Sequence, residues 1–114
     1  MSSEIIRNLL MSHNWNNKLQ CDFFTTIRSA SIYNVDTLKI GKTVNIKGII
    51  KSSFHCRILY SKKVQFKNIP KALIMLDCGY PYLEACNIFA KMNNCTAIEL
   101  QNIYFIYVLL QVIK

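Results

Sequence analysis

Residues 43–51 read Thr-Val-Asn-Ile-Lys-Gly-Ile-Ile-Lys, and they alternate between apolar and polar side chains. Successive side chains of an extended strand point to opposite faces, so the apolar members share one face and the polar members share the other. The two faces carry, respectively, Val44, Ile46 and Ile50, and Asn45, Lys47 and Lys51. The stretch therefore predicts a β-strand with one buried face and one basic face in solvent.

Neighbouring stretches extend this strand into a sheet. Residues 54–61 repeat the alternation, with Tyr60 on the inner face, and we predict a hairpin turn at Ser61 to Lys63 before a short strand at Val64 to Phe66. β-Branched and aromatic residues also crowd into Phe23 to Arg28, which predicts a strand or an extended turn. The same composition in residues 96–113 predicts one long strand or two shorter ones.

Three helices are expected around this sheet. Ser2 or Ser3 can cap a helix to about His13, because the apolar pairs at 5–6 and 9–10 fall on one helical stripe. Pro70 and Pro81 each suit the first turn of a helix, where the missing amide proton costs nothing. These helices would end near Leu76 and at Asn93 or Asn94. Together the elements predict an α+β fold with a largely antiparallel, curved sheet and flanking helices.

Length and composition favour one domain over residues 1–114. Of the 114 residues, 52% are hydrophobic and 18% are charged, which suits a chain with a packed core rather than a disordered one. The N-terminus lacks the apolar region of a secretory signal, and the longest apolar run, Ile103 to Leu110, is far shorter than the roughly 20 residues of a membrane-spanning helix. We therefore expect a cytoplasmic protein without membrane contact.

The basic residues are concentrated in one block. Residues 37–76 contain nine of the fourteen Lys and Arg residues and no Asp or Glu. An acid-free block of this length creates a sustained positive potential, which attracts polyanions. We expect it to contact nucleic acid, RNA or a single strand in preference to duplex, through Lys42, Lys47, Lys51, Arg57 and Lys67.

Arg28 and three aromatic residues complete the predicted interface. A guanidinium offers a planar fork of donors that matches phosphate oxygens or a base edge, although Arg28 could also form a structural ion pair with Asp22, Asp36 or Asp77. Trp15, Tyr33 and Tyr80 are candidates to stack on unpaired bases, and Tyr33 and Tyr80 are favoured because they adjoin loops.

Other site chemistries find little support in the sequence. The five cysteines form no C-x-x-C pair, which fits neither a disulfide framework nor a zinc ribbon. His13 and His55 are not paired at helical spacing, and no Gly-rich phosphate loop is present. We predict no metal and no cofactor.

Several motifs occur in the order typical of a known family. Phe24-Thr25-Thr26-Ile27-Arg28 resembles the Thr-x-Arg segment of the ASCH family, a branch of the PUA-like fold associated with RNA binding. Tyr33, the strand entry at 40–46, the Ile-Pro pair at 69–70 and the segment 77–80 are similar to the later motifs of that family. The resemblance implies a small β-barrel with helices beside it, and a cleft where the Thr-x-Arg segment meets the barrel.

Some ASCH proteins are amidohydrolases that deacetylate acetylcytidine with a Lys, a Thr and a Glu. The resemblance assigns the Thr to Thr26, but Phe23 and Cys78 stand at the Lys and Glu positions, with Asp77 only adjacent. Lys18 lies five residues upstream of Phe23 and would need a different backbone path. Because a Thr hydroxyl needs a base to accept its proton, the sequence favours binding over catalysis.

Three hypotheses remain. The first is a nucleic-acid-binding ASCH-like module. The second is a small amidohydrolase for acylated nucleosides, with Thr26 as nucleophile, Arg28 holding the substrate and Asp77 in place of the missing acid. The third is a viral inhibitor or adaptor that binds a host protein, because the abundance of Ile, Asn and Lys suggests an AT-rich genome such as that of a phage. For this last function, residues 103–110 would form an edge strand able to pair with another chain.

Overall fold

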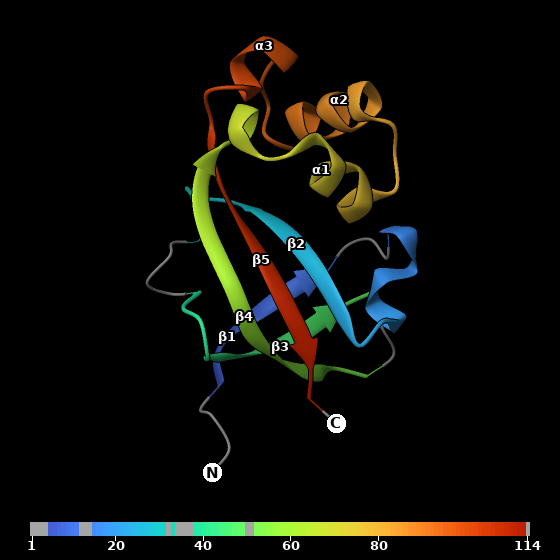
Figure 1. The fold of residues 1–114 in the computed structure, drawn as a ribbon, viewed down its shortest axis with the longest axis vertical. Coiled ribbons are helices and arrows are strands. Elements are labelled where there is room, and N and C mark those ends of the chain that lie inside the picture. The colour runs from blue at the N-terminus through green and yellow to red at the C-terminus, as the bar shows by residue number, and fades with distance from the viewer. Residues whose placement is uncertain (1–4, 12–14, 32, 34–37, 50–51, 114) are drawn as a thin grey trace.

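The computed structural model describes residues 5–11, 15–31, 33, 38–49 and 52–113. Within these residues five strands form one curled mixed sheet, a half-barrel, and three α-helices lie beyond one end of it, away from both termini (Figure 1). The strands are β1 (Ile5–Met11), β2 (Phe23–Ser29), β3 (Thr43–Gly48), β4 (Phe54–Gln65) and β5 (Tyr104–Val112). The α-helices are α1 (Lys71–Cys78), α2 (Tyr82–Met92) and α3 (Ala97–Leu100), and two 3-10 helices are η1 (Trp15–Gln20) and η2 (Phe66–Asn68). The predicted α+β class, curved sheet and flanking helices are confirmed.

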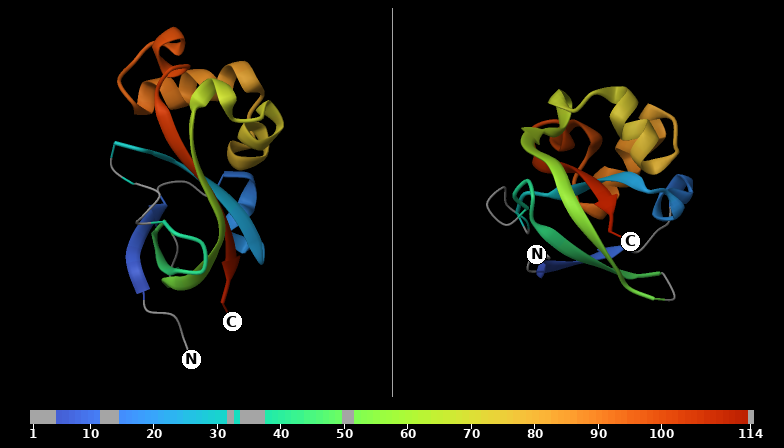
Figure 2. Two further views of the ribbon diagram at one scale, coloured as in Figure 1. Left: turned by 60° about the vertical axis from the view of Figure 1, so that its left-hand side comes forward. Right: turned by 60° about the horizontal axis from the view of Figure 1, so that its bottom comes forward.

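The strands follow the order β1-β3-β4-β5-β2 across the sheet. β1 and β3 are parallel, and the other described pairings are antiparallel. The right-hand view of Figure 2 shows the sheet curling, so that β1 passes beneath β2 although the two strands are its opposite edges.

A strand stands where a helix to His13 was predicted. β1 pairs with β3, Leu9 opposite Ile46, and its side chains alternate: Leu9 and Met11 are buried, whereas Leu10 is 64% exposed. The helix prediction was wrong because two short apolar pairs do not discriminate between the helical and extended periods. The hydrogen bonds to β3, more than 30 residues away, select the strand.

β4 is one continuous strand of 12 residues, so the predicted hairpin turn at Ser61 to Lys63 is wrong. Residues 61–63 instead pair with β5, from Val108 to Ile106. A register shift between Ile58 and Tyr60 changes the alternation, and it leaves Tyr60 42% exposed rather than inside. No tight turn forms there because β5 pairs with β4 from Cys56 to Gln65.

The two helices predicted from prolines are confirmed. Pro70 and Pro81 stand at the N-caps of α1 and α2. α1 continues past Leu76 and ends at Gly79, whose φ of 79° is the left-handed cap conformation that glycine adopts without strain. Asp77 consequently lies in the last turn of the helix rather than in a loop.

The C-terminal segment contains a short helix before its strand. Thr96 and Glu99 form a capping box that starts α3, with Glu99 N donating to Thr96 Oγ1 and Thr96 N donating to Glu99 Oε1. β5 then runs between β4 and β2. The prediction that residues 103–110 form an edge strand is therefore wrong.

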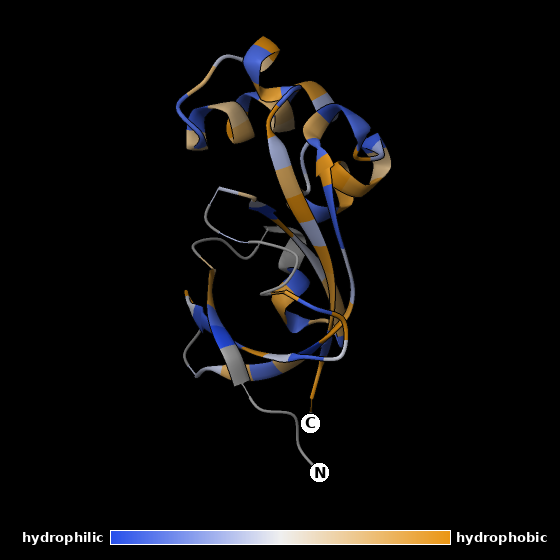
Figure 3. Cartoon of the chain, turned by 90° about the vertical axis from the view of Figure 1, so that its left-hand side faces the viewer, coloured by the Kyte–Doolittle hydropathy of each residue, from blue (hydrophilic) through white to orange (hydrophobic). Residues whose placement is uncertain are grey.

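Two hydrophobic cores lie on opposite faces of β5. Ile106, Val108 and Leu110 point into the half-barrel, whereas Phe105 and Tyr107 point toward the helices. Figure 3 shows the distribution of apolar and polar residues along the strands and helices. In the second core the rings of Phe66, Phe89 and Phe105 form a cluster with centroids 5.5 to 6.0 Å apart.

None of the described helices is long and apolar enough to cross a membrane.

Candidate functional site

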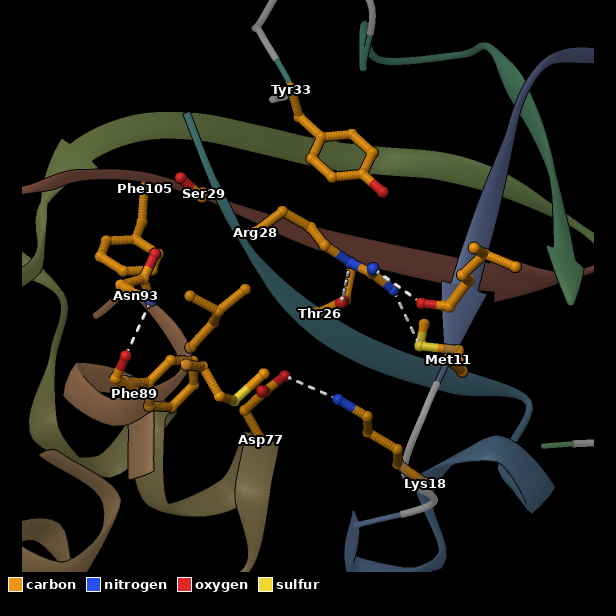
Figure 4. Close-up of a pocket in the computed structure, with 13 residues that line it drawn as sticks. Met11, Lys18, Thr26, Arg28, Ser29, Tyr33, Asp77, Phe89, Asn93 and Phe105 are labelled. Atoms are coloured by element: carbon orange, nitrogen blue, oxygen red, sulfur yellow. Dashed lines mark hydrogen bonds and ion pairs between the residues drawn. The ribbon is translucent and has the colours of Figure 1, made fainter. Parts of the chain in front are cut away.

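A cavity of about 260 Å³ lies beside the outer edge of β2, between the end of β1, η1 and the helices α1 and α2 (Figure 4). Because β2 is an edge strand, residues from both of its faces reach the cavity. Its lining residues are Leu10, Met11, Lys18, Thr26, Ile27, Arg28, Ser29, Tyr33, Asp77, Phe89, Met92, Asn93 and Phe105.

An ion pair between Lys18 and Asp77 forms one wall. Lys18 Nζ donates to Asp77 Oδ1 over 3.1 Å, and Thr25 Oγ1 donates to the same oxygen over 2.8 Å. The side chains of Lys18 and Asp77 are only 9% and 2% exposed. The three residues join η1, β2 and α1, so they fix the position of the helices against the sheet at this point.

Arg28 forms the opposite wall. Its Nε donates to Thr26 Oγ1 at 2.9 Å, Nη1 donates to the carbonyl oxygen of Leu10 at 2.8 Å, and Nη2 approaches Met11 Sδ at 2.9 Å. Asp77, one of the three alternative ion-pair partners considered for Arg28, acts on it as a nearby charge, whereas the hydrogen bonds of Arg28 go to Thr26, Leu10 and Met11. The contacts hold the guanidinium in one orientation.

Tyr33 covers the cavity above Arg28 (Figure 4). The Cζ atom of Arg7 lies 4.1 Å from the centroid of the Tyr33 ring, and that of Arg28 lies 5.6 Å from it. Two guanidinium groups therefore already contact this ring, which makes it a cover with positive charge beside it rather than an open platform for a base.

Burial shifts the pKa values of two charged groups in the cavity, Arg28 and Asp77. It lowers the pKa of Arg28, although an arginine remains protonated in proteins. It raises the pKa of Asp77, an effect that outweighs the opposing attraction of Lys18 and the hydrogen bond from Thr25. The cavity thus offers fixed positive charge, the hydroxyl groups of Thr26, Ser29 and Tyr33, and one carboxyl group that ionises reluctantly.

The structure brings together Thr26, Arg28, Tyr33 and Asp77 from the predicted site. Tyr80 lies elsewhere, partly buried against the core beneath the helices. The side chain of Trp15, together with Lys51 and Asp36, lies outside what the structure describes.

The predicted basic residues stay outside the cavity. Lys42, Lys47, Arg57 and Lys67 are all exposed. Lys42 and Arg57 are neighbours, because the Lys42 carbonyl accepts from Ile58 N at 2.8 Å. Lys67 lies beyond the far end of β4, where its Nζ donates to Asn102 Oδ1 at 3.2 Å. We call Lys42, Lys47 and Arg57, which lie on or directly before the paired strands β3 and β4, the basic patch, and Lys67 lies apart from it at the helical end.

Sequence reasoning gave no role to Lys18 and overlooked Thr25. Lys18 reaches the cavity because η1 turns the chain back before β2, so a residue eight positions from Thr26 lines the same cavity. A lysine beside Leu19 in a short polar segment carried no signal of burial. A pairing with Asp77 becomes visible only when η1 and α1 are placed side by side.

The fold and the cavity define a small α+β half-barrel with a pocket at one sheet edge, and the largely apolar lining of this pocket carries two cationic side chains, one carboxyl group and several hydroxyl groups. The described residues contain no group of three or more His, Cys, Asp or Glu side chains that could hold a metal ion. No protein-family model, curated protein sequence or solved structure matches this chain.

Proposed function

We propose that this chain is a PUA-like, ASCH-related module that binds single-stranded nucleic acid, RNA above all, with one nucleotide seated in the cavity. The observation that carries the proposal is the convergence of Thr26, Arg28 and Tyr33, the residues of the ASCH-like motifs, on one cavity. At about 260 Å³ the cavity lies near the lower end of ligand pockets, roughly 300 to 1,000 Å³, and suits a single nucleoside-sized group rather than a duplex.

The basic patch on β3 and β4 supplies the second part of the proposal. Lys42, Lys47 and Arg57 are exposed and can meet phosphates without losing a buried partner. Such contacts release counterions, which makes binding weaken steeply with salt. Those contacts do not discriminate among sequences, whereas Arg28, held in one orientation, discriminates among ligands in the cavity.

Binding of labelled single-stranded RNA, single-stranded DNA and duplex, measured by fluorescence anisotropy from low to moderate salt, tests this proposal. Each lost phosphate contact lowers the logarithmic salt slope by about 0.7 for a single strand, so changing Lys42, Lys47 and Arg57 together to Gln should lower it by about 2. Lys67→Gln, away from the patch, should lower the slope by less than the value of about 0.7 expected for one phosphate contact. Lys91→Gln on α2 is the control and should leave the slope unchanged. Absence of binding at low salt, or a slope unaffected by the triple change, would contradict the proposal.

Amide hydrolysis is a second candidate function, favoured by one observation. Lys18, a buried amine, lines the same cavity as Thr26. In this reaction the proton of the Lys18–Asp77 pair would rest on Asp77, so that Lys18 Nζ could accept the hydroxyl proton as Thr26 Oγ attacks the acyl carbon. The amide C–N bond would then break as Lys18 returns that proton to the leaving amine, and water would hydrolyse the resulting Thr26 ester to release the acid and restore the hydroxyl. Arg28 now donates to Thr26 Oγ1, so it would stabilise the developing negative charge.

Turnover of a panel of acylated nucleosides distinguishes the two functions. An enzyme should lose turnover in Thr26→Ala and in Lys18→Ala, and should retain part of it in Thr26→Ser. A binding module should show no turnover with any of these compounds, while its affinity for single strands persists.

A further inference from the structure

A second cavity of about 380 Å³ adjoins the first. The two cavities share Ser29 and Asn93 as lining residues, and the second continues toward Lys63 on β4 and Tyr104 at the start of β5. The two cavities are therefore neighbours, as the sites of two successive nucleotides would be.

The second cavity is lined by an aromatic ring, a cation and two hydroxyl groups. Lys63 Nζ lies 5.3 Å from the centroid of the Tyr104 ring, and Tyr104 is 50% exposed. Ser29 Oγ and Ser31 Oγ are hydrogen-bonded at 2.8 Å, and Ser29 Oγ also accepts from Ser31 N. Ala30 N donates to the Tyr104 carbonyl oxygen at 3.1 Å, which anchors these serines beside the ring.

Asn93 stands at the boundary between the two cavities. Its Nδ2 donates to the carbonyl oxygen of Phe89 at 2.7 Å, which fixes the orientation of the amide (Figure 4). The Oδ1 atom points the other way and can accept a hydrogen bond from a ligand that passes the boundary.

We infer that this second cavity is the subsite for the adjacent nucleotide, with its base stacked on Tyr104 and its phosphate bound by Lys63 and the hydroxyls of Ser29 and Ser31. The inference rests on the proposed function, because it assumes a nucleotide in the first cavity. Tyr104 is the better stacking candidate of the two tyrosines, because two guanidinium groups contact the Tyr33 ring, whereas Tyr104 is 50% exposed and Lys63 alone of the described cations is placed over its ring. Aromatic rings of this kind hold successive bases with little regard to sequence.

The experiment compares a nucleoside monophosphate, a dinucleotide and a hexanucleotide of single-stranded RNA by calorimetry. The dinucleotide should bind the full-length protein about tenfold more tightly than the monophosphate. Tyr104→Ala should abolish that gain and leave the monophosphate affinity unchanged, while Tyr104→Phe should keep it. Phe23→Ala is the matched control, because Phe23 is 53% exposed at the opposite end of β2 and lines neither cavity.

The Lys63 phosphate contact can be tested independently of the Tyr104 stacking contact, through the salt dependence of dinucleotide binding. Lys63→Gln should lower the salt slope for the dinucleotide by about 0.7, whereas Lys62→Gln, on the opposite face of the same strand, should not. A dinucleotide gain that persists in folded Tyr104→Ala, or wild-type affinity that is the same for one and two nucleotides, would overturn the subsite alone. Failure of the wild type to bind any of the three ligands would overturn both the subsite and the proposed function.

Discussion

Arg28 on β2 donates from Nη1 to the backbone carbonyl oxygen of Leu10 on β1, 2.8 Å away. These strands are the two edges of the sheet, so the bond joins the open sides of the half-barrel. The same side chain lines the cavity and donates to Thr26. One residue thus both closes the fold and forms the binding wall, and its substitution should affect both properties.

Arg28→Ala should lower the free energy of unfolding by about 1.5 to 3 kcal/mol, because the Leu10 carbonyl loses a charged donor. Arg28→Lys should recover only part of this loss, since an ammonium cannot serve Leu10 and Thr26 in the geometry of a planar fork. Chemical denaturation measures both variants, with the exposed Arg57→Ala as the control. A loss in Arg28→Ala no larger than in the control would show that the bridge contributes nothing to stability.

Breaking the Lys18–Asp77 pair should be costly, whereas replacing the whole pair should not. Lys18→Met alone leaves a buried carboxyl group without its cation, and the expected loss is roughly 3 to 5 kcal/mol at neutral pH. The double variant Lys18→Met with Asp77→Leu removes both charges and should be close to wild type in thermal unfolding. A double variant less stable than Lys18→Met alone would mean that the ionic interaction itself holds the helices to the sheet.

Asp77 should make stability fall as pH rises. Burial raises the pKa of Asp77 above its ordinary value of 3.8, so between these two values the folded protein keeps a proton that the unfolded chain has lost. A folded state that binds more protons is destabilised by increasing pH. The difference in unfolding free energy between wild type and Asp77→Asn should therefore shift against the wild type as pH rises from about 4, and a shift in its favour would contradict the raised pKa.

The cysteines should differ sharply in reactivity. Burial raises the pKa of Cys56 to about 12, and its side chain is fully buried, whereas Cys21 is exposed. Only the thiolate reacts readily with an alkylating reagent. At pH 8, mass spectrometry of peptides should find Cys21 modified in the native protein and Cys56 modified only after denaturant is added. Equal labelling of both in the native state would show that the half-barrel opens frequently.

Gly48 at the end of β3 should not tolerate a side chain. Its φ is 116°, and a Cβ atom there would collide with the backbone carbonyl of Met11 on β1. Gly48→Ala should therefore destabilise the protein by more than 1 kcal/mol and weaken the β1–β3 pairing, as seen by amide exchange of β1. Gly41→Ala is the control, because Gly41 also has a positive φ, of 88°, but open space around it. If both variants lost the same unfolding free energy, the positive φ and not the collision with Met11 would account for the effect.

The local sequence determined the elements whose signal lies within a few residues. The alternation at 43–48 gave β3, the aromatic and β-branched run at 23–28 gave β2, and Pro70 and Pro81 opened their helices. These predictions succeeded because side-chain periodicity and the missing proline amide act through the chain's nearest neighbours.

Tertiary structure decided the rest. β1 is a strand because β3 pairs with it, and β4 runs without a turn because β5 lies along it. Lys18 lies against Asp77, 59 positions away, because the sheet curls and α1 packs over η1. Such contacts depend on how distant segments meet, which no local pattern encodes, and they assemble the cavity around residues that the sequence could only name separately.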